Sequence, residues 1–148
     1  MADNMDESAR LLNNYNLTYS IIGTPKTAEL YNLNILKEQK AKNVLLHCYS
    51  GSVEFMRECV KVGWYIALGG VVTFKNAVKM KEVAKEVPLD KLVLETDSPY
   101  LTPVPFRGKE NKPAYVRYVA EEIAKIREIS VEEIIDITTR NAEEIFGI

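Results

Sequence analysis

His47 and Asp97 are the residues whose types and positions best suit chemistry. His47 is the one histidine of the chain, near the end of the apolar run 44–48. Asp97 follows the apolar run 91–95, with Glu95 two residues before it. Imidazole and carboxylate groups both ligate zinc-like divalent ions, and an aspartate beside such an ion could deprotonate the attacking water. Together, His47 and Asp97 therefore allow a shared metal site.

Each of these residues also has a purely structural interpretation. His47 could be a hydrogen-bonded histidine packed at the end of a strand, and Asp97 could close an Asx turn or cap a helix. Glu95 and Asp97 have the same strand parity, so they point to the same side if the strand extends that far. Charges at the end of a buried strand are costly unless they are paired, hydrogen-bonded or bound to metal.

The segment that follows Asp97, residues 100–113, is rich in proline and basic residues. Its prolines and glycine predict a stiff, irregular loop. Arg107 is the best phosphate ligand in it, because its planar guanidinium carries a fork of donors. The alternative is a solvated connection whose charges face water.

Alternating elements are expected to position these residues. Short apolar, partly β-branched runs predict buried parallel strands at 18–22, 44–48, 64–68 and 91–95. Amphipathic patterns predict helices at 6–14, 28–40, 53–62, 74–86 and 113–128, and a capping box beginning at Ser130 predicts one more. Pro113 suits the start of the helix at 113–128, because its missing N–H needs no partner there. The order of elements fits the same scheme.

The βα alternation predicts a parallel α/β sheet with two additional C-terminal helices. Four strands could form part of a (β/α) barrel or a small open sheet. A complete eight-stranded barrel needs about 250 residues, and this chain has 148. The residues alone do not choose between the two.

Composition limits the function classes. The chain is 47% apolar and 27% charged, which is typical of one soluble domain, and its net charge of −2 provides no global field for nucleic acid. The acidic N-terminus has no signal-peptide pattern and no apolar run is long enough to span a membrane, so we expect a cytoplasmic protein without a membrane partner. Cys48 and Cys59 do not form a disulfide framework, and Cys48 is interpreted as a small core residue. The pair Gly69-Gly70 permits a close backbone approach but matches no phosphate-binding motif.

The motifs around these residues resemble one family. Residues 47–51 resemble the His-Cys-Phe-Ser-Gly signature of TatD-type hydrolases, and residues 95–101 resemble that family's Glu-Thr-Asp-x-Pro-Tyr-Leu. Residues 105–113 are similar to its Pro-Tyr-Arg-Gly-Lys-x-Asn-x-Pro loop, and the likeness covers about 33–148 in family order.

The resemblance implies a partial TIM-barrel-like fold of the amidohydrolase type and divalent-metal-dependent hydrolysis of phosphodiester bonds in DNA. It places His47 and Asp97 at metal-ligand positions, chiefly of different ions in a two-metal site, gives Asp97 a role toward the attacking water, and puts Arg107 near substrate phosphates. It does not identify the ion as zinc, magnesium or manganese.

Three motifs of the family are absent from the sequence: a first-strand His-x-His, a bridging glutamate and a further ligand histidine. Residues 7–25 faintly resemble the family's second βα region. We therefore expect residues 1–148 to form a single incomplete domain, a C-terminal half with a short N-terminal remnant, that lacks a start and an internal segment, about half a barrel in all. Metal binding should be weak, full activity of the monomer is not expected, and exposed sheet edges should favour a homo-oligomer. The alternatives are a catalytically impaired remnant or binding protein of the same family, and an unrelated α/β phosphate-binding domain.

Overall fold

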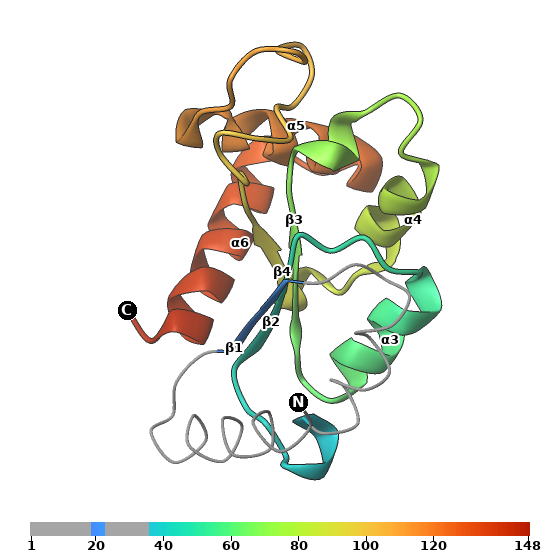
Figure 1. Ribbon diagram of the computed structural model, residues 1–148, viewed down its shortest axis with the longest axis vertical. Helices are drawn as coiled ribbons and strands as arrows, with labels where there is room; N and C mark the ends of the chain where they lie inside the picture. Colours follow the sequence, from blue (N-terminus) through green and yellow to red (C-terminus); the bar gives the residue numbers. More distant parts are fainter. Residues whose placement is uncertain (1–18, 23–35) are drawn as a thin grey trace.

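The computed structural model describes residues 19–22 and 36–148, and a four-stranded parallel sheet runs through them (Figure 1). The strands lie in chain order as β1 (Tyr19–Ile22), β2 (Val44–His47), β3 (Tyr65–Leu68) and β4 (Leu92–Leu94). All three pairings are parallel, so the carboxyl ends of the strands meet at one edge of the sheet. That edge is where side chains placed just after each strand can meet.

Four complete α-helices and three short 3₁₀ helices connect and cover the strands in the described residues. The α-helices are α3 (Val53–Lys61), α4 (Val78–Glu86), α5 (Val116–Arg127) and α6 (Val131–Phe146). The 3₁₀ helices are η1 (Gly70–Thr73), η2 (Leu89–Lys91) and η3 (Pro113–Tyr115). Serine side chains cap two of the α-helices: Ser52 accepts from the Phe55 N–H, and Ser130, the predicted N-cap, accepts from the Glu133 N–H.

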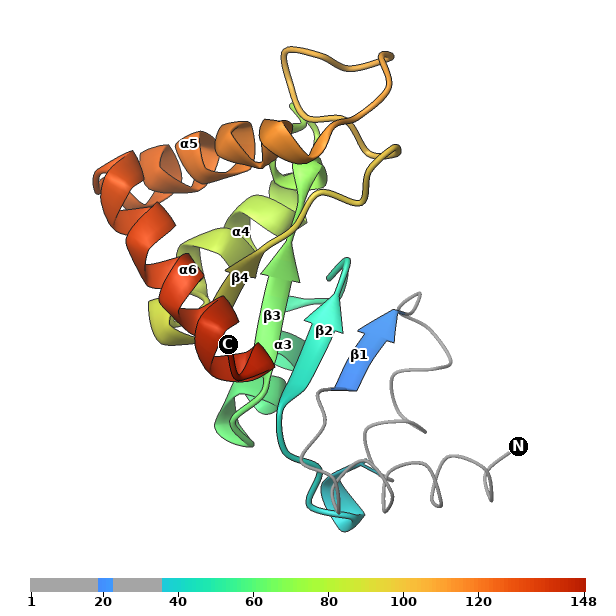
Figure 2. The same cartoon turned by 90° about the vertical axis from the view of Figure 1, so that its left-hand side faces the viewer.

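The two faces of the sheet have different covers (Figures 1 and 2). Alternate strand residues such as Val44, Ile66 and Leu92 are buried against apolar residues of α3, α4 and α5. The other face presents Leu45, Tyr65, Ala67 and Val93, which pack with Ile145 of α6. His47 has the strand parity of Leu45, so α3 to α5 leave its face of the sheet to the candidate site and to α6.

Most predicted elements are present within one or two residues of the expected bounds. The helix expected at 6–14 lies outside the described residues, as does 28–40 up to residue 35; residues 36–38 are helical. Pro113 begins η3, which leads directly into α5. Each of the strands expected at 44–48, 64–68 and 91–95 is present.

The helix expected at 74–86 was wrong at its start, because α4 begins only at Val78. Before it, the Thr73 hydroxyl donates to the Gly70 carbonyl at 2.7 Å and accepts from the Val104 N–H at 2.9 Å. These bonds end η1 as a separate turn tied to the following loop. Phe74 then has an extended backbone, ψ 141°, which a helix cannot accommodate.

A search of the described part of the chain found no helix with both the length and the apolar character needed to cross a bilayer.

Candidate metal centre

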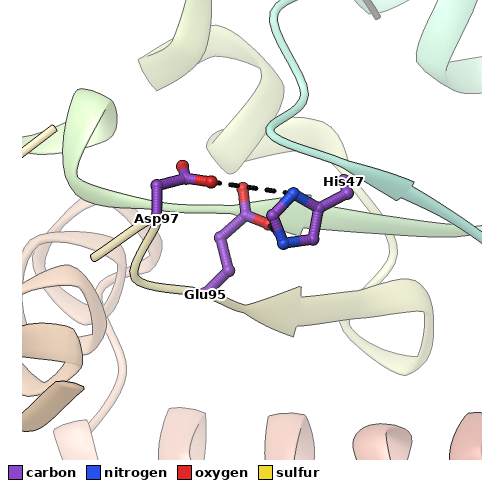
Figure 3. Close-up of side chains that lie close together, drawn as sticks. All are labelled: His47, Glu95 and Asp97. Carbon is purple, nitrogen blue, oxygen red and sulfur yellow. Dashed lines mark ion pairs between the residues drawn. The ribbon is translucent and has the colours of Figure 1, made fainter. Parts of the chain in front are cut away.

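His47, Glu95 and Asp97 meet at the carboxyl edge of the sheet (Figure 3). His47 is the last residue of β2, whereas both carboxylates come from the segment after β4. One nitrogen or oxygen atom of each side chain lies within 4.8 Å of the others. The predicted pairing of His47 with Asp97 therefore has a geometric basis, and Glu95 joins it.

Gly69 makes this convergence possible, since β3 lies between the two strands that carry the cluster. A Cβ atom on Gly69 would lie 3.1 Å from Glu95 Cγ and 3.2 Å from Asp97 Oδ2. The hydrogen side chain at the end of β3 thus leaves the space that both carboxylates occupy. Its neighbour Gly70 approaches the loop even more closely: a Cβ there would be 2.0 Å from the Leu101 carbonyl oxygen. The close approach expected at Gly69-Gly70 is confirmed.

The histidine ring faces both carboxylates. Its Nε2 is 3.0 Å from Glu95 Oε2, and its Nδ1 is 3.6 Å from Asp97 Oδ1. Figure 3 shows the three side chains pointing toward one another, with dashed lines marking these ion pairs. The His47 side chain is 29% exposed, whereas Glu95 is 7% and Asp97 15% exposed. The carboxylates therefore form the floor of the site and the imidazole its more accessible side.

Glu95 is fixed by the backbone of the neighbouring segment. The Cys48 N–H donates to Glu95 Oε1 at 2.8 Å, which leaves Oε2 directed toward His47. Burial raises the pKa of the Glu95 carboxyl to about 8; the Cys48 N–H opposes this, and the nearby Asp97 charge adds to it. A carboxylate in this position requires a compensating positive charge to remain ionised at neutral pH.

Three donor atoms of the cluster are buried without a hydrogen-bond partner among the residues that the structure describes: His47 Nδ1, Glu95 Oε2 and Asp97 Oδ2. Buried polar atoms are rarely left in this condition unless an ion, a water molecule or a function accounts for them. One imidazole nitrogen and two carboxylate oxygens form a suitable donor set for a divalent transition-metal ion. The residues present therefore fit such an ion.

The backbone at both ends of the cluster is unusual. Cys48 and Asp97 have φ values of 50° and 55°, in the left-handed region that non-glycine residues seldom adopt. Each such residue costs about 1 kcal/mol or more and persists only where its surroundings hold it. The left-handed turns re-aim the chain just where the site residues leave β2 and β4.

Cys48 is half-buried at the end of β2, so its interpretation as a core residue was wrong. The left-handed turn takes it out of the alternation of the strand and places it beside the carboxylates. Burial, followed by the charge and hydrogen bond of Asp97 and the charge of Glu95, raises the pKa of the Cys48 thiol to about 12. In the metal-free chain these surroundings favour the neutral thiol over the thiolate.

Arg107 is not part of the cluster but lies on the loop after Asp97. Its guanidinium stacks on the Phe74 ring, 3.8 Å from the ring centroid, at an exposed position. Such stacking holds the planar group while its N–H edges remain available to an anion. The loop itself rests on the stacked rings of Phe106 and Tyr115, whose centroids are 4.5 Å apart.

Glu95 is the site residue that the sequence reasoning did not choose. Its signal was present: it lies two residues before Asp97 with the same strand parity, so both carboxylates were expected on one side. Its Oε2 is buried, has no hydrogen-bond partner among the described residues and lies 3.0 Å from His47 Nε2. Glu95 is therefore as good a candidate ligand as the other two residues.

The cluster opens to solvent through a wide pocket of about 720 Å³, lined by the three site residues together with Leu94, Thr96, Ser98 and Val116. Ser98 Oγ is also buried without a hydrogen-bond partner among the described residues. A substrate could therefore reach the carboxylates directly from this side.

Comparison with known proteins places these features in a family. Residues 13–147 match the family of TatD related DNases. The metal-dependent hydrolase YabD of Bacillus subtilis is 56% identical over 118 residues, which cover 78% of this chain and 46% of YabD. The metal-dependent hydrolase YcfH of Escherichia coli K12 is 43% identical over 134 residues, which cover 89% of this chain and 51% of YcfH. The chain thus spans about half the length of the curated relatives it matches.

The fold agrees with this assignment. The crystal structure of YjjV, a TatD homologue from Escherichia coli K12, superposes with a TM-score of 0.85 at 26% identity and covers 97% of this chain and 55% of YjjV. A TatD family hydrolase from Entamoeba histolytica superposes with a TM-score of 0.76. The predicted α/β fold, part of a TIM-barrel-like structure, is therefore confirmed. This chain belongs to the TatD family of metal-dependent hydrolases.

Proposed function

We propose that this chain contributes a metal-dependent phosphodiesterase site that acts on DNA, with His47, Glu95 and Asp97 as ligands of one divalent ion. The observation that carries the proposal is a cluster of three buried ligand atoms that have no hydrogen-bond partner among the described residues. Its DNA substrate is supported by the family match to TatD related DNases. The imidazole donor favours zinc over magnesium and manganese, which prefer oxygen ligands.

The ion, when bound, supplies a Lewis acid that activates water and neutralises charge on a phosphate oxygen. Among the described residues, Asp97 is the proton acceptor that we propose, because its carboxylate group lines the open pocket: one of its oxygens would bind the ion and the other would take the proton. Glu95, held by the Cys48 N–H, keeps His47 and Asp97 in place. His47 offers a ring nitrogen to each side of the cluster.

Arg107 is proposed to bind a substrate phosphate beside the cluster. Its guanidinium stacks on the Phe74 ring, so little further ordering is needed before its N–H groups can bind a phosphate. We expect Arg107→Ala to raise KM for a DNA oligonucleotide roughly 10–100-fold while leaving kcat within about twofold. Arg107→Lys should recover only part of this loss, because lysine lacks the planar fork.

The alternative is a chain that binds the ion or DNA without cleaving it. The observation that favours it is length: the chain spans about half of its relatives, and all three ligands come from β2 and the segment after β4. Hydrolysis of a fluorescent DNA oligonucleotide and of bis(p-nitrophenyl) phosphate, with Zn²⁺ or Mn²⁺ and with EDTA, separates the two. Metal-dependent hydrolysis lost in Asp97→Asn supports the enzyme. Tight metal binding without hydrolysis supports the binding protein. A chain that shows neither metal binding nor hydrolysis would contradict both proposals.

A further inference from the structure

Asn111 is a buried polar residue at the far end of the loop that follows the metal cluster, and it is 3% exposed. Its side-chain amide nitrogen donates two hydrogen bonds of 2.6 Å, one to the Thr96 carbonyl and one to the Tyr100 carbonyl. Thr96 is the residue between Glu95 and Asp97. A single amide group therefore holds the backbone that carries both carboxylates.

The two carbonyls bracket a tight turn. Within it, the Tyr100 N–H donates to the Asp97 carbonyl at 2.8 Å, and Asp97 has its left-handed φ of 55°. A left-handed aspartate costs free energy and stays in place only if its neighbours hold it. The Asn111 amide holds this turn at both ends, through the Thr96 carbonyl before Asp97 and the Tyr100 carbonyl after it.

Asn111 is itself fixed by backbone groups. Its N–H donates to the Pro99 carbonyl at 3.0 Å, and its side-chain oxygen accepts from the Lys112 N–H at 2.8 Å. Every hydrogen-bonding group of the side chain is thus directed by the loop, which makes the clamp rigid.

We propose that Asn111 is a positioning residue for the metal centre: its amide clamps the Thr96–Tyr100 turn and so directs the Glu95 and Asp97 carboxylates toward His47. The inference rests on the proposed function, because it assigns Asn111 a role toward the same cluster. Groups that orient metal ligands typically change metal affinity 10–100-fold when they are removed.

The side-chain chemistry distinguishes asparagine from its closest isostere. Aspartate has the same size but no donors, so it would face two carbonyl oxygens without a hydrogen bond. An additional carboxylate near the cluster would by itself attract a cation. A loss of metal affinity in Asn111→Asp therefore reports lost geometry and not lost charge.

The chain contains a matched control at the opposite end of β4. Asn141 of α6 is 6% exposed, and its amide nitrogen donates to the Leu89 and Leu92 carbonyls at 2.6 and 2.7 Å. Like Asn111, it therefore donates two hydrogen bonds to backbone carbonyls, but away from the cluster. Asn141→Asp should destabilise the fold to a similar extent without changing the metal centre.

The experiment compares the wild type, Asn111→Asp, Asn111→Ala and Asn141→Asp by two measurements. Titration calorimetry with Zn²⁺ should show roughly 10–100-fold weaker binding for the Asn111 variants and less than threefold change for Asn141→Asp. In the metal-free proteins at one fixed pH, the ring resonances of His47, the single histidine, should move in the Asn111 variants and not in Asn141→Asp. Equal Zn²⁺ affinity and unmoved His47 resonances in the Asn111 variants would overturn the inference, as would equal effects of the Asn141 control.

A wild type that binds no Zn²⁺ would refute the proposed function, and the His47 resonances would then decide the positioning role alone. A measurement on the wild type covers the case in which the Asn111 variants do not fold. Addition of Zn²⁺ should shift the side-chain amide resonances of Asn111 and leave those of Asn141 in place. Unmoved Asn111 resonances in the Zn²⁺-bound chain would contradict the clamp. If the chain binds no Zn²⁺, fast exchange of the Asn111 side-chain amide protons with solvent would contradict it.

Discussion

Glu95 shows how a single buried carboxyl links stability to metal binding. It is fixed by the Cys48 N–H, faces His47 and lies in a poorly solvated floor. Without an ion, that environment favours the protonated acid, since burial raises its pKa to about 8. With an ion bound, Glu95 Oε2 becomes a ligand, so metal uptake at neutral pH should release a proton.

The pH dependence of stability tests this description of Glu95. A carboxyl whose pKa is higher in the folded than in the unfolded state stabilises the fold below its unfolded pKa, near 4.5, and this contribution disappears as pH rises toward 8. We expect the free energy of unfolding of the metal-free wild type to fall by on the order of 3 kcal/mol between pH 5 and 8 relative to Glu95→Gln. Urea unfolding of both proteins in EDTA measures the difference, and parallel profiles would contradict it.

At the scale of elements, the turn after β3 sets the space available to the cluster. Gly69 has an ordinary extended backbone, so its lack of a side chain serves only the carboxylates that lie 3.1–3.2 Å from where a Cβ would be. Gly70 serves the packing of η1 against the following loop, where the Leu101 carbonyl leaves no room. Adjacent glycines thus have separate roles.

Alanine at each glycine should separate these roles. Gly69→Ala should displace Glu95 or Asp97 and weaken Zn²⁺ binding about tenfold, with a loss of stability near 1 kcal/mol. Gly70→Ala should cost about 3 kcal/mol, because backbone must move to admit the Cβ. Calorimetric titration and thermal unfolding measure the two quantities, and a larger loss of stability in Gly69→Ala than in Gly70→Ala would reverse the assignment.

The elements could be predicted from the sequence because their signals are local. The buried, partly β-branched runs predicted β2, β3 and β4, and the capping box at Ser130 predicted the start of α6. The start of α4 could not be predicted, since it depends on a hydrogen bond from Val104, 31 residues after Thr73. The left-handed turns at Cys48 and Asp97, which bring Glu95 into the cluster, likewise depend on contacts between distant segments.

At the scale of the whole molecule, the sheet formed by the described strands is open. The parallel strands begin with β1 and end with β4, and Asn141 of α6 donates to the Leu92 carbonyl at the β4 side. An open sheet related to half of a barrel has edges that can pair with another chain. Association through such an edge remains a prediction from the sequence.

Sedimentation velocity over a range of protein concentrations tests this association. We expect the sedimentation coefficient to rise with concentration toward that of a dimer, because two open sheets can remove their free edges together. A strictly monomeric wild type at all concentrations would contradict the expectation.

The central claim is that His47, Glu95 and Asp97 together hold one divalent ion. Titration calorimetry of the metal-stripped chain with Zn²⁺ tests it most directly, with His47→Ala, Glu95→Gln and Asp97→Asn as variants and Asp90→Asn, a carboxylate at the opposite end of β4, as control. We predict one ion per chain for the wild type and the control, and binding at least about 100-fold weaker in each of the three variants. No Zn²⁺ binding by the wild type, or undiminished binding in the three variants, would contradict the claim.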